Sequence, residues 1–177
     1  PILSDNAAYP VSYVKRANRH NPLTGDYAAA EKIFMKYLII NADDFGMSKI
    51  FNKSILDLIK DEKIKSTTVM IDKIAEDQKE QVEELIKLSK TINLSVGLHL
   101  SFKNSDYENQ IKLQYDKFLK IFNFNPSHID IHKASQLKDS ISIVANFCKE
   151  KKLPCRNKGG NIEYFKTTDA PSFHGTT

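Results

Sequence analysis

Carboxylates and imidazoles follow apolar segments at several points of the sequence. Asp43 and Asp44 stand side by side after the apolar run that begins at Tyr37, while His99 and His132 end two later apolar segments. One carboxylate and two imidazoles form a mixed oxygen and nitrogen ligand set that leaves open positions on a divalent ion. A hydrolytic metal site needs such positions for water and substrate. The recurrence of these residues at the ends of apolar segments therefore favours a metal-dependent hydrolase.

Each of these residues also has an ordinary interpretation. Two adjacent aspartates before "FGMSK" can form an Asx turn or cap a helix, and for Asp43 and Asp44 taken alone this alternative stays open. A single histidine is more often a core or surface residue than a ligand. Only their recurrence at successive segment ends favours chemistry.

A parallel sheet would bring these residues together. From Met35 onward, strand patterns of apolar residues alternate with helical patterns. Strands are expected at 36–42, 66–71, 94–100, 127–132 and 153–157, and helices at 50–64, 75–91, 107–123 and 138–152. This alternation predicts βαβ crossovers and an α/β fold. The carboxyl ends of parallel strands meet at one edge of a sheet, where the loops form the site.

Side-chain alternation predicts which strand residues face the interior. In the third expected strand, His99 lies on the face opposite the leucines, which must pack on helices. In the fourth, His128, Asp130 and His132 share one face. Burial of three ionisable side chains is costly unless they are paired or bind a metal. This face is therefore expected to line the site.

Composition narrows the class of protein. The chain has 177 residues, of which 41% are apolar, enough for one domain with a core. The net charge of +4 comes from lysines scattered among acidic residues, which argues against nucleic-acid binding. Cys148 and Cys155 have no zinc-site spacing and are expected to be reduced thiols. No apolar run reaches membrane-spanning length, so a cytoplasmic protein without membrane contact is expected.

The N-terminal residues differ in composition and periodicity from the rest of the chain. Residues 1–34 have scattered Pro and Asn and no sustained period, so they are interpreted as an N-terminal extension without an assigned role. Met35 opens the first apolar strand pattern. The predicted organisation is therefore an extension over 1–34 and one domain over 35–177.

Four segments together resemble a known family. "YLIINADDFGMSK", "STT", "VGLHLSF" and "PSHIDIHK" occur in the order found in the YdjC-like carbohydrate deacetylases, which include chitooligosaccharide deacetylases. The resemblance implies a distorted (β/α) barrel that binds one divalent metal ion, magnesium or zinc. It implies Asp44, His99 and His132 as the metal ligands and Asp43 as the general base. The implied reaction removes N-acetyl groups from acetylated amino-sugar oligosaccharides.

The chain departs from this family in two respects. Family members commonly continue the "HxDxH" element with further histidines, whereas this chain continues with Lys133, Ala134, Ser135 and Gln136. Lys133 is a candidate cation near the leaving group, and Asp130 and His128 are candidates for orienting a ligand or contacting substrate. The second departure is length, since the chain has roughly five βα units where a closed barrel has eight.

The short length and the altered motif affect both the expected assembly and the expected function. An incomplete barrel leaves an open sheet edge, which predicts either a homodimer formed through that edge or marginal stability. Alternative functions are a catalytically silent carbohydrate-binding or degenerate deacetylase-like domain, and a metal hydrolase acting on another amide or ester.

Overall fold

The computed structural model describes residues 39–156, without the side chains of 134–137. The expected extension over 1–34 lies outside the described residues, as do both ends of the expected domain over 35–177. The division into these two parts stays a prediction.

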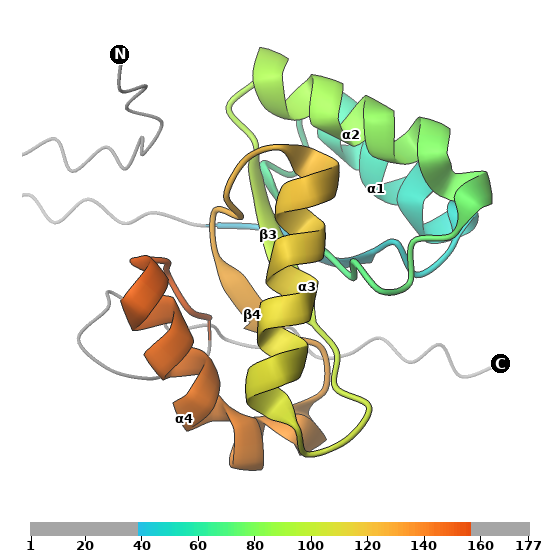
Figure 1. The fold of residues 1–177 in the computed structure, drawn as a ribbon. Helices are drawn as coiled ribbons and strands as arrows, with labels where there is room; N and C mark the ends of the chain where they lie inside the picture. Colours follow the sequence, from blue (N-terminus) through green and yellow to red (C-terminus); the bar gives the residue numbers. More distant parts are fainter. Residues whose placement is uncertain (1–38, 157–177) are drawn as a thin grey trace, which may run out of the picture. The chain divides into compact units, whose positions relative to one another are not determined.

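The strands form one open parallel sheet in sequential order. The strands are β1 (Asn41–Phe45), β2 (Ser66–Val69), β3 (Ser95–Leu100) and β4 (Ile129–Ile131), and each pairs in parallel with the next. Figure 1 shows β4 beside β3. Beyond β4, an isolated parallel bridge joins Ile129 to Cys155, where a fifth strand was expected. The predicted α/β class is confirmed, and the sheet does not close within the described residues.

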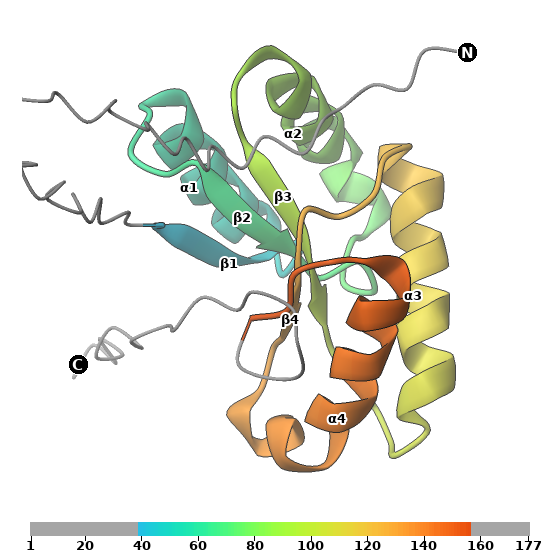
Figure 2. The same cartoon turned by 90° about the vertical axis from the view of Figure 1, so that its left-hand side faces the viewer.

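Helices connect the strands and cover one face of the sheet (Figure 2). They are α1 (Lys49–Lys60), a 3-10 turn η1 (Glu76–Gln78), α2 (Lys79–Thr91), α3 (Tyr107–Phe122) and α4 (Ala134–Lys151). Right-handed crossovers between sequential parallel strands place their helices on the same face. Helix α1 packs against α2, and α3 packs against α4. Helix α3 also lies against β3, and α4 lies against β4.

The two faces of strand β3 differ, as the alternation of its side chains predicted: one packs on the helices, and the other faces the candidate site. Val96, Leu98 and Leu100 are buried in the hydrophobic cluster on the helix side. His99 points to the opposite face and is also buried. Burying a Leu or Val side chain stabilises the fold by about 1.5–3 kcal/mol, so this leucine face fixes the orientation of His99.

Helix α1 buries one stripe of side chains against the sheet and α2. Its buried residues recur at the helical period and are Asn52, Ile55, Leu56 and Ile59. The exposed large apolar residues of the helix are Ile50, Phe51 and Leu58. The stripe thus contains a polar residue, Asn52, where an apolar one would be expected.

Several predicted element boundaries were wrong, and two of them bear on the site. The first strand was expected to end before the aspartate pair, but β1 includes Asp43 and Asp44, because pairing with β2 continues as far as Phe45 and Val69. Helix α4 begins at Ala134 rather than at 138. Apolar periodicity could not locate that start, because the first turns of α4 are mostly polar in sequence.

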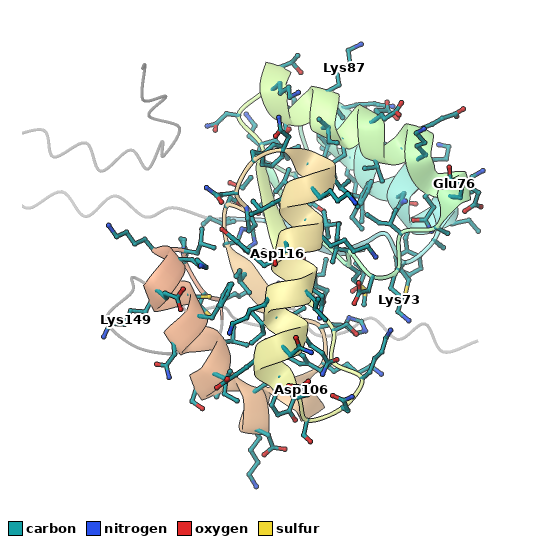
Figure 3. The ribbon with its side chains drawn as sticks, in the orientation of Figure 1. Lys73, Glu76, Lys87, Asp106, Asp116 and Lys149 are labelled. Carbon is teal, nitrogen blue, oxygen red and sulfur yellow. The ribbon has the colours of Figure 1, made fainter. Side chains whose placement is uncertain are left out.

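Charged side chains project from the outer surface of the helices and loops. Figure 3 shows this for Lys73, Glu76, Lys87, Asp106, Asp116 and Lys149, all of which are exposed. Their mixed signs agree with solvated helix faces. Within 39–156, no helix has both the length and the apolar character required to cross a bilayer.

Candidate metal centre

A β-bulge in β1 brings both aspartates to the same side of the sheet. Ala42 pairs with Thr67 and Phe45 pairs with Val69, so β1 contains one more residue than β2 between these two pairs. In a regular strand, adjacent side chains point to opposite faces. The extra residue breaks this alternation, as bulges beside active sites often do. Asp43 and Asp44 can therefore act in one site.

The backbone of Asp44 adopts a left-handed conformation, with φ of +70°. Aspartate tolerates this region better than most residues, but the conformation still needs support from its surroundings. A turn follows, in which Met47 N–H donates to the Asp44 carbonyl at 3.0 Å. Gly46 in this turn has φ of +99°, and a Cβ atom there would lie 2.9 Å from the Met70 carbonyl oxygen. Only glycine fits this position.

Three side chains from different strands converge beside the bulge. Asp44 Oδ1 lies 2.9 Å from His132 Nδ1 and 3.2 Å from His99 Nε2, and the two histidine nitrogens are 3.3 Å apart. The three predicted ligands are thus brought together. The side chains of Asp44 and His132 are 26% and 17% exposed, while that of His99 is 3% exposed. The cluster is therefore anchored in the interior and open toward solvent.

The spacing of these donor atoms fits a shared divalent ion. Ligand bonds of about 2.0–2.2 Å place neighbouring donors about 3.3–3.6 Å apart around a tetrahedral ion and about 2.8–3.1 Å apart around an octahedral one. The three observed separations lie within the span of these two arrangements. Two imidazole nitrogens and one carboxylate oxygen suit zinc and several other divalent metals. These residues could hold one ion and leave further positions for water or substrate.

The electrostatics of the cluster favour a cation between the side chains. Hydrogen bonding to His99 lowers the pKa of Asp44, although partial burial opposes this effect. Burial disfavours the charged form of His99, but the carboxylates of Asp130 and Asp44 outweigh it and raise its pKa to about 9. Both shifts reflect attraction between carboxylates and positive charge on the imidazoles at this place. A metal ion would meet the same negative potential.

A second group of acidic residues surrounds a guanidinium group. Arg156 NH1 donates to Asp43 Oδ1 and Oδ2 at 2.7 and 2.8 Å and to Asp130 Oδ2 at 2.8 Å. Asp43, Asp130 and His99 have the composition of a metal-binding group, with donor atoms within 4.8 Å of one another. Arg156 already supplies the cation to these two carboxylates. Of the two groups, the one that contains Asp44 and His132 is therefore the better candidate for a metal.

Asp130 connects this ion-paired group to His99. Its Oδ2 lies 3.3 Å from His99 Nδ1, although the two atoms are not aligned for a hydrogen bond. Its other oxygen accepts from the Ile131 backbone N–H at 2.7 Å. Burial would raise the pKa of Asp130, but His99 and Arg156 hold it below its usual value. Asp130 therefore lies in contact with His99, and its role in orienting the His99 ring stays a prediction.

The remaining predicted residues lie apart from the three donor atoms. The His128 ring packs over Gly97 so closely that a Cβ atom at Gly97 would lie 2.6 Å from it. Its Nδ1 pairs with Ser127 Oγ at 2.9 Å, and burial lowers its pKa to about 4. Lys133 is exposed and directly precedes α4. No contact in the described residues supports a ligand role for His128, and the role of Lys133 stays a prediction.

Comparison with known proteins agrees with the motifs that form this cluster. Residues 37–107 match the family model described as YdjC-like protein. The chain contains a YdjC-like region. The resemblance expected from the sequence is confirmed, and the matched residues include Asp43, Asp44 and His99.

Curated relatives are similar over a larger share of the chain than the family model. A carbohydrate deacetylase of Clostridium beijerinckii is 30% identical over 152 residues, which cover 68% of this chain and 59% of the relative. A chitooligosaccharide deacetylase of Klebsiella pneumoniae is 27% identical over 153 residues, with the same shares covered. The chain thus spans 59% of the length of these two relatives.

A solved structure supports the fold of the YdjC-like region. The crystal structure of a proposed cellobiose-phosphate cleavage protein from Enterococcus faecalis V583 aligns with a TM-score of 0.55 at 22% identity. The alignment covers 67% of this chain and 57% of that protein. At this identity the likeness concerns the arrangement of strands and helices.

Sequence reasoning missed several partners of the aspartates in the YdjC-like region. Arg156 was assigned only to a short fifth strand, although it follows that strand at the same edge of the sheet as the other charges. Asn41 Nδ2 and Thr68 Oγ1 donate to Asp43 Oδ1 at 2.6 and 2.8 Å. The strand-end rule that selected the aspartates would also have selected Arg156.

Proposed function

We propose that this chain is a metal-dependent carbohydrate deacetylase that removes N-acetyl groups from amino-sugar oligosaccharides of the chitooligosaccharide type. The observation that carries the proposal is the close triangle formed by Asp44, His99 and His132 beside a separately ion-paired Asp43. The names of the relatives support the substrate class. Asp44 Oδ1, His99 Nε2 and His132 Nδ1 are the proposed ligands of one divalent ion, zinc or magnesium. When bound, the ion would polarise the acetyl carbonyl and increase the acidity of water.

Asp43 is the proposed general base. Its Oδ1 accepts from Asn41, Thr68 and Arg156, whereas the contact found for Oδ2 within the described residues is with Arg156. Oδ2 therefore has a lone pair left to accept a proton from the attacking water. The water oxygen bonds to the acetyl carbon, the C–N bond breaks, and the amine nitrogen takes a proton as it leaves.

Arg156 and Thr68 are proposed to hold this base in place. Three donors on one oxygen restrict rotation of the Asp43 carboxylate, and Arg156 keeps it close to Asp130. A charge-assisted hydrogen bond is roughly twice as strong as a neutral one. The orientation of Oδ2 is therefore fixed before substrate arrives, which favours proton transfer.

Metal content tests the proposed ligands. Elemental analysis of the purified 177-residue chain should show about one divalent ion per molecule, and Asp44→Ala and His132→Ala should each lose it. Asp57→Ala is a matched control, because Asp57 lies in an exposed ion pair on α1. Unchanged metal content in both ligand variants would refute the site.

Acetate release tests the reaction and the base. The chain should release acetate from diacetylchitobiose, and Asp43→Asn should lower this rate by about 10²–10⁴-fold while metal content stays the same. A chelator should abolish the activity, and added zinc or magnesium should restore it. Acetate release by Asp43→Asn at the rate of the unmodified chain would rule out the assigned base.

The oligomeric state of the protein and its location in the cell stay proposals. Within residues 39–156, β1 is paired on one side only, and this edge would allow two chains to pair as a homodimer. Analytical ultracentrifugation would detect the homodimer. A cytoplasmic location remains as predicted from the sequence, and cell fractionation would test it.

A further inference from the structure

Asn52 is a fully buried amide in the apolar stripe of α1. Its side chain has no exposed surface, and its neighbours on the stripe are Ile55 and Leu56. Burying an amide is unfavourable unless its hydrogen bonds are made. The contacts of Asn52 therefore indicate why a polar residue is present here.

The hydrogen bonds of Asn52 define the orientation of its amide. The Gly46 backbone N–H can only donate, so the atom 2.6 Å away must be Asn52 Oδ1. Nδ2 then donates to Gln78 Oε1 at 3.2 Å and to Gln81 Oε1 at 3.1 Å. Gln81 Nε2 in turn donates to the Lys49 carbonyl at 2.9 Å. One acceptor is thus directed at the β1 turn and two donors at the α2 side.

The bond to Gly46 holds a peptide plane one residue beyond Asp44. The Phe45–Gly46 peptide is fixed at its N–H by Asn52 and at its carbonyl by Met70 N–H, which donates to Phe45 O at 2.7 Å. The preceding carbonyl, that of Asp44, accepts from Met47. Rotation of the Asp44–Phe45 plane would change ψ of Asp44, and this plane is joined through Phe45 to the Phe45–Gly46 plane that Asn52 holds. The direction of the Asp44 carboxylate therefore depends on this hydrogen bonding.

We propose that Asn52 is a positioning residue, whose amide oxygen holds the Gly46 N–H and so keeps Asp44 directed at His99 and His132. This inference rests on the proposed metal site and adds a residue outside the ligand set. Asn52 acts through the backbone and does not contact the reacting atoms. Partners of metal ligands outside the first coordination sphere commonly determine metal affinity in this way.

The chain contains a matched control for this proposal. Gln114 is a buried amide on α3 that bonds both backbone groups of Ser101, accepting from its N–H at 3.1 Å and donating to its carbonyl at 3.0 Å. Ser101 follows His99 by two residues, as Gly46 follows Asp44 by two. His99, however, lies within a regular strand. Loss of the Gln114 amide should therefore affect stability more than metal binding.

Cobalt titration of the full chain tests the proposal. Asn52→Leu keeps the number and branching of the side-chain heavy atoms but cannot accept from the Gly46 N–H, and it should weaken Co²⁺ binding by about 10–100-fold. Gln114→Leu, the matched control, should bind Co²⁺ within about threefold of the unmodified chain. Equal Co²⁺ affinity in Asn52→Leu and the unmodified chain would overturn the proposal, as would equal weakening by Gln114→Leu.

A metal-free measurement separates this inference from the proposed function. NMR hydrogen exchange should show the Gly46 amide exchanging at least tenfold faster in Asn52→Leu, with the Asp44 ψ changed, whereas Gln114→Leu should affect Ser101 instead. If the unmodified chain bound no Co²⁺, the metal site would fail while these data still decided the role of Asn52. Unchanged Gly46 exchange and Asp44 ψ in Asn52→Leu would refute the inference alone.

Discussion

The turn after β1 and the loop after β3 hold their candidate ligands in different ways. Both have a buried amide from the following helix, Asn52 on Gly46 and Gln114 on Ser101. His99, however, is part of a regular strand in register with Asp130, whereas Asp44 lies in a bulge with a left-handed backbone. Within 39–156, β1 is also paired on one side only. The position of His99 follows from the sheet, and that of Asp44 depends on local contacts.

This difference shows where stability and function separate. A regular strand holds a ligand through pairing and core packing, so changes that move His99 should also unfold the protein. A bulge stabilised by a few hydrogen bonds can be disturbed while the sheet survives. Strained backbone at functional sites depends on surrounding structure in this way.

Replacement of the ligands themselves should have the largest effect. Asp44→Asn tolerates the left-handed backbone and should change the free energy of unfolding by less than about 1 kcal/mol. His99→Gln disturbs buried polar contacts and should cost about 1–3 kcal/mol. Both variants should lose more Co²⁺ affinity than the roughly 10–100-fold expected for Asn52→Leu, which changes a residue outside the ligand set. Urea unfolding and Co²⁺ titration measure the two quantities, and a stability loss in Asp44→Asn matching that in His99→Gln would break the comparison.

Arg156 ties the bulge to the regular part of the sheet and should come next in effect. Arg156→Leu removes one of the two cationic neighbours of the buried Asp130 carboxylate, leaving His99, and should lower the free energy of unfolding by about 1–3 kcal/mol. Arg156→Lys keeps the charge and should cost less, although it loses the two-oxygen contact with Asp43. Thermal melting provides the measurement, and a melt of Arg156→Leu identical to that of the unmodified chain would contradict this link.

A methyl group at Gly46 should disturb the bulge more than a similar change disturbs the β3 loop. Gly46→Ala faces both a left-handed φ and the nearby Met70 carbonyl, and should cost about 1–3 kcal/mol. Ser101→Ala keeps the backbone bonds to Gln114 and should stay within about 0.5 kcal/mol. Chemical denaturation of both variants tests this, and equal stabilities would show that the bulge is not sensitive.

The outer end of the Asn52 network should show the smallest effect. Gln81→Ala removes one acceptor from Asn52 while Gln78 remains, so the free energy of unfolding should fall by about 0.5–1.5 kcal/mol. Co²⁺ affinity should change less than about threefold, because the Asn52 oxygen still faces Gly46. Gln110→Ala, which removes an amide that caps Lys103 in the loop before α3, is the control. A large loss of Co²⁺ affinity in Gln81→Ala alone would extend the positioning network to α2.

The regular part of the site could be predicted from the sequence. Alternation in β3 and β4 gave the inward positions of His99, Asp130 and His132, because a leucine or isoleucine face must pack on helices. The parallel sheet followed from the order of strands and helices. These features depend on periodic burial, which a sequence records directly.

The irregular part could not be predicted by the same reasoning. Alternation puts Asp43 and Asp44 on opposite faces, and only the bulge brings both to one site. Asn52 left a signal, a polar residue on the helical stripe of Ile55 and Ile59, but its partners lie in a turn and in distant helices. Contacts of that kind depend on backbone geometry that no local pattern specifies.

The packing of His128 over Gly97 links two separate motifs. The imidazole occupies the volume that any side chain at position 97 would need. Gly97 cannot then change freely on its own, since a larger residue at 97 requires a smaller one at 128. Among related chains, a side chain at the glycine of "GLH" should therefore occur only where the first histidine of "HIDIH" is replaced by a smaller residue.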